Sequence, residues 1–158
     1  MAQEKPIFSS FMMLFSMVDP GVILEEIVQH MGEELRRRGI HLRMDRRTPL
    51  PMVRLNLRQF RSSLQLVMEF FPVLLPRGGE LEIAAGIREI DGEQYVEIGA
   101  VSSSTIFDVI RPFLQVGNHQ AVLNIALARQ ILRRYRGRIL FLKENPQRVA
   151  FTILLKVS

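Results

Sequence analysis

The segment 80–101, ELEIAAGIREIDGEQYVEIGAV, decides the fold class of this chain. Apolar and polar residues alternate on both sides of Asp91-Gly92, a dipeptide that favours the two-residue turn of a β-hairpin. Alternation with a period of two indicates strands that bury one face. The segment therefore predicts a hairpin within a sheet that a second layer covers on one side.

An amphipathic helix is predicted well upstream of this hairpin. Asp19-Pro20 has the features of an N-cap followed by a proline in the first turn, and Gly39 is a typical residue to follow the C-terminus. The arginines 36–38 would lie in the last turn, where positive charge favours the helix dipole. We expect one apolar face, formed by Val22, Ile23, Ile27, Val28, Met31 and Leu35.

Two further long helices are predicted. Asn56 is expected to cap a helix that ends near Phe71, and a third helix is expected from about Ala121 to Tyr135. The inner face of the second helix should consist of Leu57, Phe60, Leu64, Val67 and Phe71.

The remaining elements are a strand, a short helix and a final hairpin. Ile40, Leu42 and Met44 alternate with polar residues, and segments 138–142 and 148–157 flank a turn at Asn145-Pro146. With a short helix after the serines 102–104, the order is α β α β β α α β β. This order predicts an α/β two-layer sandwich, with a mixed and largely antiparallel sheet covered on one face by about three helices.

Composition restricts the classes of function. The chain has 158 residues, of which 47% are hydrophobic and none is cysteine, so we expect one domain in a reducing cytoplasm without a thiolate metal site. No apolar run has the length of a membrane span. The net charge of +5 comes mainly from arginine, which suits acidic partners and equally fits a biased base composition.

Nucleic-acid binding is not favoured by the pattern of basic residues. A group of arginines lies close together in the sequence, but only core-like phenylalanines accompany them, without the aromatic–basic interleaving that single-strand binding favours. These arginines are Arg43, Arg46, Arg47, Arg54, Arg58 and Arg61.

Several strings resemble, in order and spacing, the ATP-binding domain of sensor histidine kinases. Residues 18–38, VDPGVILEEIVQHMGEELRRR, resemble its first helix, and 74–83, LLPRGGELEI, resemble the segment after its asparagine box. Residues 109–113, VIRPF, are similar to its phenylalanine box. Residues 123–129, LNIALAR, are similar to its helix opening LGLAIVR, and 135–139, YRGRI, stand where it has HGGxI.

The resemblance covers roughly residues 18 to 157. It implies the Bergerat-type ATPase fold shared with gyrase, the MutL mismatch-repair proteins and the ninety-kilodalton heat-shock chaperones. It also implies a nucleotide site built from an asparagine box and two glycine boxes.

The asparagine box is replaced. Counting back from Gly78-Gly79 places Leu66 and Phe70 where the resemblance implies two asparagines, one of which coordinates magnesium. Phenylalanine offers no oxygen ligand, and magnesium requires oxygen donors in near-octahedral geometry.

The first glycine box, DxGxG, is replaced by AVSSS. Ala100 stands at the aspartate that accepts a hydrogen bond from adenine, and Ser102 and Ser104 stand at the glycines. A hydrogen bond to a charged group is worth ~1.5–3 kcal/mol, so this loss alone would weaken adenine binding tenfold or more.

The second glycine box, GxGLGL, is replaced as well. Gln120, Val122 and Asn124 stand at its glycines, at a helix N-terminus of the kind that receives phosphate. The flexible lid before this helix is reduced to about Gly117-Asn118-His119, which predicts His119 in a loop.

The N-terminal segment, residues 1–18, is predicted as a unit separate from the domain of residues 19–158. Its run IFSSFMMLFSMV at residues 7–18 fits two interpretations equally. It either packs on its own domain or forms a docking or homodimer surface through Phe8, Phe11, Met12 and Phe15.

The replaced boxes predict a non-catalytic pseudo-ATPase or pseudokinase domain of a bacterial two-component pathway, with no cofactor. Such a module would bind a protein partner, either a response regulator or a histidine kinase. The alternative is a domain with an atypical site that still binds ATP with magnesium.

Overall fold

The structure is a computed structural model that describes residues 15–46, 49–69, 75, 77–103, 119–134, 136–145 and 148–157. These residues form three helices and seven strands. They are β1 (Phe15–Val18), α2 (Pro20–Arg37), β2 (His41–Arg46), β3 (Val53–Asn56), α3 (Leu57–Met68), β4 (Glu80–Ile90), β5 (Glu93–Ser102), α6 (His119–Arg133), β6 (Arg138–Asn145) and β7 (Arg148–Lys156).

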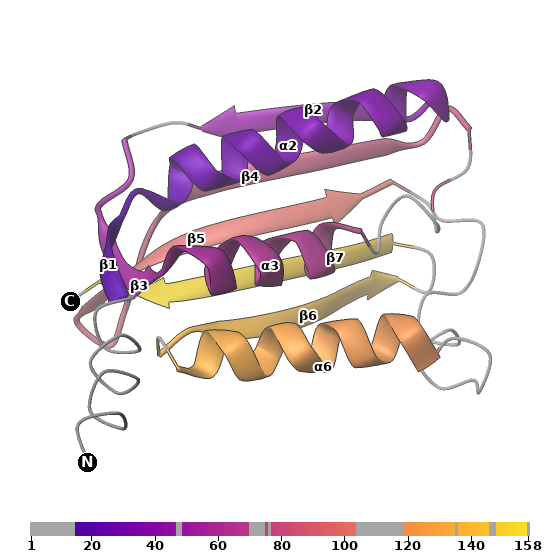
Figure 1. Cartoon of the computed structure of the whole chain (residues 1–158). Helices are drawn as coiled ribbons and strands as arrows, with labels where there is room; N and C mark the ends of the chain where they lie inside the picture. The colour runs from indigo at the N-terminus through magenta and orange to yellow at the C-terminus, as the bar shows by residue number, and fades with distance from the viewer. Residues whose placement is uncertain are drawn as a thin grey trace, which may run out of the picture.

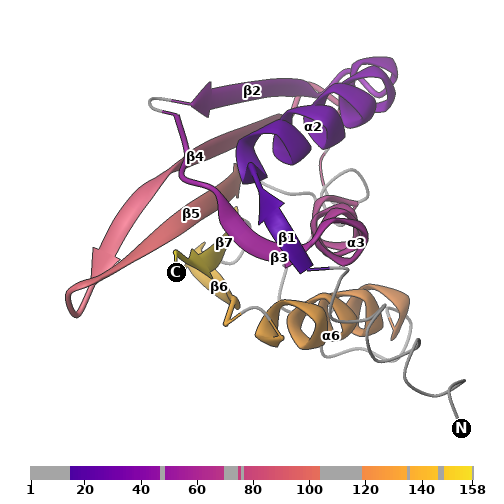
Figure 2. The same cartoon turned by 60° about the vertical axis from the view of Figure 1, so that its left-hand side comes forward.

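Five strands form the main sheet in the order β2-β4-β5-β7-β6. β2 runs parallel to β4, and the other neighbouring strands are antiparallel. α2, α3 and α6 lie side by side on one face of this sheet (Figure 1), and Figure 2 shows the two layers from the side. The predicted two-layer α/β sandwich with a mixed, largely antiparallel sheet is confirmed.

The central hairpin forms where the sequence predicts it. β4 and β5 pair from Leu81 with Ser102 to Ile90 with Glu93. Asp91 and Gly92 have φ values of 52° and 78°, the left-handed conformation that a two-residue hairpin turn requires at both positions. The strand ends at Ser102, the first of the three serines at which the sequence predicts a break.

The core lies between the sheet and the helices. Alternate residues of the three central strands point into it and are at most 5% exposed, which is the period of two that the sequence displays. They are Leu81, Ile83 and Ala85 of β4, Val96, Ile98 and Ala100 of β5, and Phe151, Ile153 and Leu155 of β7.

The first helix begins as predicted. The Asp19 side chain accepts a hydrogen bond from the Gly21 backbone N–H at 2.9 Å, and Pro20 occupies the first turn. The predicted inner face is wrong at one position, because Val22 is 46% exposed whereas Leu24 is fully buried. Val22 and Leu24 lie 200° apart on a helix, so they cannot both face inward.

The second helix also has the predicted cap. The Asn56 side chain accepts a hydrogen bond from the Gln59 backbone N–H at 3.0 Å. Leu57 is exposed rather than internal, and Met68 is buried in the last turn of the helix. The helix ends at Met68, before the predicted end, and Phe71 lies outside the described residues.

A small second sheet was not predicted. β1 pairs antiparallel with β3, from Phe15 with Asn56 to Val18 with Val53. The predicted element order has no strand at Val53–Asn56, because four residues carry too little alternation to distinguish a strand from a loop. The last four residues of the N-terminal segment are therefore paired with the domain.

Candidate functional site

The positions at which the resemblance implies a nucleotide site lie, where the structure describes them, at one end of the molecule. They lie on α3, at the end of β5 and at the start of α6, and α3 packs against α6 (Figure 1). The site residues Phe8, Phe11, Met12, Phe70 and Ser104 lie outside the described residues.

Leu66 is half-buried and packs against the core from α3. Its side chain is a hydrocarbon without any atom that donates or accepts a hydrogen bond. At the position implied for an asparagine, this part of α3 contributes apolar packing.

Ala100 lies in the middle of the sheet. It is 1% exposed and pairs with Ile83 on β4 and with Phe151 on β7. Ala100 lies two residues from the buried Ile98, so both side chains are on the same face of β5. Its methyl group therefore points toward the helical layer, the side on which an adenine would lie. No acceptor for an adenine amino group exists on this side chain.

The serines after Ala100 hold the end of β5 to the start of β4. Ser102 is 1% exposed and pairs with Leu81. The Ser103 hydroxyl accepts a hydrogen bond from the Glu80 N–H at 2.8 Å, and the Ser103 N–H donates to the Glu80 carbonyl at 2.8 Å. The segment that replaces the first glycine box thus forms strand and ladder contacts.

The segment that replaces the second glycine box is helical. α6 begins at His119, so Gln120, Val122 and Asn124 lie within its first two turns, where the first backbone N–H groups lack partners inside the helix. The side chains of residues 119–124 are outside the description. The predicted loop position of His119 is wrong, since the helix starts two residues earlier than expected.

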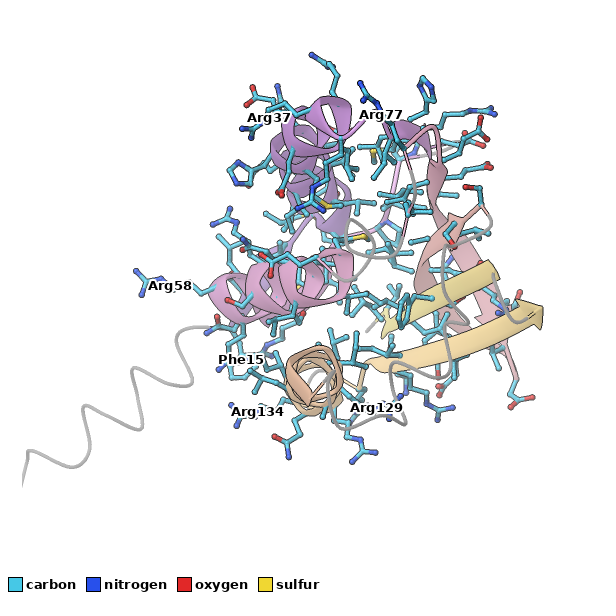
Figure 3. The ribbon with its side chains drawn as sticks, turned by 90° about the vertical axis from the view of Figure 1, so that its right-hand side faces the viewer. Phe15, Arg37, Arg58, Arg77, Arg129 and Arg134 are labelled. Carbon is cyan, nitrogen blue, oxygen red and sulfur yellow. The ribbon has the colours of Figure 1, made fainter. Side chains whose placement is uncertain are left out.

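Phe15 is the part of the predicted docking surface that the structure describes. It lies in β1, half-buried, and packs against the core (Figure 3). Part of its ring is therefore covered by the domain itself.

Four of the arginines that are close in sequence, Arg43, Arg54, Arg58 and Arg61, lie on three different elements. Arg43 lies on β2 at one edge of the sheet, Arg54 on β3 and Arg58 on α3 (Figure 3). Arg61 forms an ion pair with Glu26 of α2 at 2.8 Å. These residues do not make a single basic stripe.

A second candidate site lies at the opposite end of the sheet, and sequence reasoning missed it. It is a cavity of about 620 Å³ where α6 ends, β6 begins, β5 begins and β7 ends (Figure 1). Its lining, which we call the arginine pocket, consists of Glu93, Tyr95, Arg129, Arg133, Arg136, Gly137, Arg138, Ile139, Leu140 and Lys156. The sequence signal for this site is the spacing of Arg129 and Arg133, which are four residues apart and therefore share one face of a helix.

Metal sites and membrane-spanning helices have structural requirements with which the described part of the chain can be compared. There, no group of three or more His, Asp or Glu side chains is placed to hold a metal ion. No helix among the same residues has the length and apolarity to cross a membrane.

The chain has the fold of a histidine-kinase-type ATPase domain. It is similar to the nucleotide-free catalytic domain of the histidine kinase ThkA, with a TM-score of 0.72, 12% identity, and 90% of this chain and 95% of that chain covered. The mycobacterial sensor histidine kinase MprB gives a TM-score of 0.66, 17% identity and coverage of 90% and 97%.

Full-length ShkA in complex with AMPPNP gives a TM-score of 0.71 at 18% identity, and covers 91% of this chain but 31% of its own. No protein-family model matches the sequence, and no curated protein matches it. The likeness is therefore one of fold.

Proposed function

We propose that this chain is a catalytically inactive, nucleotide-independent relative of histidine kinase ATPase domains that regulates a two-component pathway in the bacterial cytoplasm by binding a protein. The observation that carries the proposal is Ala100. A methyl group stands at the implied aspartate position, 1% exposed and between Ile83 and Phe151. A domain that bound adenine in the manner of its structural relatives would need a hydrogen-bond acceptor there.

Two further observations support the loss of the nucleotide site. Leu66 adds apolar packing at the implied asparagine position. Ser102 ends β5 and pairs with Leu81, and the Ser103 backbone hydrogen-bonds to Glu80, so this backbone is held by the start of β4. We propose no cofactor for the domain.

The retained fold supports a role in recognition. We propose that a surface for contacts within two-component systems is retained without ATP chemistry, because such a surface would depend on the exposed faces of the elements and not on the cleft. We propose a response-regulator receiver domain or a histidine kinase as the partner. The N-terminal segment, through Phe8, Phe11, Met12 and the open part of Phe15, would extend that surface or join two copies of the chain.

Thermal unfolding with and without millimolar Mg-ATP tests the loss of the nucleotide site. A ligand at one hundred times its Kd stabilises a protein by about 2.7 kcal/mol. For a chain of this size that corresponds to a rise in Tm of roughly 5–10 °C. We expect no magnesium-dependent rise, so Mg-ATP should raise the Tm no more than ATP in EDTA does, and isothermal titration with ATP and ADP should give no magnesium-dependent heat.

Binding to a panel of receiver domains and kinase dimerisation domains tests the regulatory role. We expect at least one partner to bind in the absence of nucleotide, with an affinity that Mg-ATP does not change. Binding that requires Mg-ATP would favour the alternative of a domain with a residual, atypical ATP site.

A further inference from the structure

The lining of the arginine pocket carries an excess of positive charge. Among the described lining residues, four arginines and Lys156 face one acid, Glu93, which gives these residues a net charge of +4. Glu93 is already engaged, because Lys156 contacts its carboxylate at 3.0 Å and the Tyr95 hydroxyl donates to it at 3.5 Å. Among the described residues, no carboxylate forms an ion pair with any of the four guanidinium groups.

The four arginines come from two different layers of the fold. Arg129 and Arg133 lie one turn apart on α6, where side chains four residues apart share a face. Arg138 and Leu140 of β6 alternate with the buried Ile139, so they belong to the open face of the sheet. The pocket therefore passes around the start of the edge strand β6, from the helical layer to the open face.

Arg136 is held in a conformation that disfavours any residue with a Cβ. Its φ is 56°, in the left-handed region, and its N–H donates to the Arg133 carbonyl at 3.1 Å. The following Gly137 donates to the Leu132 carbonyl at 2.8 Å. These two hydrogen bonds define the helix ending at which glycine is the usual left-handed residue. Here the position carries a guanidinium that lines the pocket.

We propose that the arginine pocket binds a small ligand that carries at least two phosphate groups. Guanidinium groups match phosphate oxygens with paired N–H donors. Two phosphate groups carry roughly three to four negative charges at neutral pH, which matches the net charge of the lining. A cavity of about 620 Å³ also has the size typical of sites for small organic ligands.

This site is independent of the proposed function. It lies at the end of the sheet where β5 begins, whereas Ala100 and Ser102 lie where β5 ends (Figure 1). Magnesium is not part of it, since the positive charge comes from side chains.

Isothermal titration of the full chain with pyrophosphate in EDTA and low salt tests the proposal. We expect binding at one site that weakens as salt screens the charges. The double substitution Arg129→Gln with Arg133→Gln should weaken it at least tenfold, because it removes two charge-assisted hydrogen-bonding groups.

The matched control removes the same charge from another helix end. Arg36→Gln with Arg37→Gln alters the last turn of α2, away from the pocket, and should change the affinity less than twofold. Arg134→Gln is a second control directly after the end of α6, because Arg134 does not line the pocket and points to a different side from Arg129 (Figure 3).

Arg136→Gly keeps the test informative if the double variant fails to fold. It should weaken pyrophosphate binding at least threefold while its Tm does not fall, which separates loss of binding from loss of structure. Equal affinity for ADP and pyrophosphate would show that the pocket recognises only the phosphate groups. Tighter binding of ADP identifies an organic diphosphate, and both results support the site.

Three results would overturn the proposal: no heat with millimolar pyrophosphate, equal losses in the α2 control and the pocket variant, or a poly-glutamate peptide that binds more tightly than pyrophosphate through the same arginines. The last result would assign the pocket to an acidic protein segment. Melting of the Arg129→Gln, Arg133→Gln protein with Mg-ATP tests the nucleotide cleft separately, so failure of one proposal is distinguishable from failure of the other.

Discussion

The C-terminal ends of α2 and α6 have the same backbone hydrogen bonds and different residues at the left-handed position. In α2, the Gly39 N–H donates to the Arg36 carbonyl at 3.0 Å and the Ile40 N–H donates to the Leu35 carbonyl at 2.9 Å. Gly39 has a φ of 72°, which is close to the 56° of Arg136 in α6. One helix end thus uses glycine where the other uses arginine.

The difference teaches how the two ends are used. At the end of α2, the Arg77 side chain lies over Gly39, and a Cβ there would stand 2.8 Å from the Arg77 Cγ. That end is closed by packing, and Ile40 is 4% exposed. At the end of α6 the same backbone geometry places a guanidinium at the rim of a cavity. Glycine would adopt this left-handed conformation without strain. An arginine at this position is therefore consistent with the proposed role of its guanidinium group in the arginine pocket.

The largest expected effect comes from the buried leucine that each ending shares. Leu35 and Leu132 are both 0% exposed, and their carbonyls accept equivalent hydrogen bonds. Leu35→Ala and Leu132→Ala should each lower the free energy of unfolding by about 2–5 kcal/mol, because each leaves a cavity. Urea denaturation measures both. A difference above about 2 kcal/mol would show that the two ends are not equivalent in packing.

Gly39→Ala should have the next largest effect. A non-glycine residue in the left-handed region costs about 1–2 kcal/mol, and the new Cβ must also displace Arg77. Chemical denaturation of Gly39→Ala, Arg77→Ala and the double variant separates the two contributions. If the double variant is as stable as Arg77→Ala alone, the backbone strain at position 39 is absent.

Arg136→Gly should stabilise the fold by about 0.5–1 kcal/mol, since glycine relieves the left-handed strain and a like charge leaves the pocket. Differential scanning calorimetry at low and high salt measures both contributions. The electrostatic part should disappear at high salt, and the backbone part should remain. A loss of stability would mean that Arg136 supports the helix end structurally.

The smallest expected effects concern the last-turn arginines themselves. Arg37→Ala should cost about 0.3–0.5 kcal/mol, because Arg37 compensates the dipole of α2. Arg133→Ala should cost less, roughly 0–0.3 kcal/mol, because repulsion from the other pocket arginines offsets the same compensation at α6. Pyrophosphate in saturating amount should reverse this order, since it stabilises only a protein with an intact pocket.

Local signals in the sequence predicted most of the fold. Asp19 and Asn56 cap their helices, Asp91-Gly92 forms the hairpin turn and Gly39 has a positive φ, all at the predicted positions. Each of these depends on interactions between residues close in sequence. The missed strand Val53–Asn56 instead depends on pairing with β1, about forty residues away, and no local pattern encodes that partner.

The candidate sites divide in the same way. An alignment of this sequence with the motifs of the resembled family is enough to place Ala100, Ser102 and Leu66 where polar or glycine residues are implied. The burial of Ala100 between two neighbouring strands could not be predicted in this way, because β7 follows fifty residues later. The arginine pocket could not be predicted from the sequence. The basic residues of the pocket lie on α6, on the turn that follows α6, and on the strands β6 and β7, and they share no motif.

The sequence by itself determined the type and boundaries of most elements and the identity of the residues available for chemistry. Capping, turn formation and periodicity depend on residues that are close in sequence, and they can therefore be predicted from the sequence alone. Only the tertiary structure decided that Leu24 and not Val22 faces inward, that β1 joins the domain, and that four arginines meet at one end of the sheet. Those outcomes depend on which surfaces touch, and contacts between distant segments are set by the packing of the whole chain.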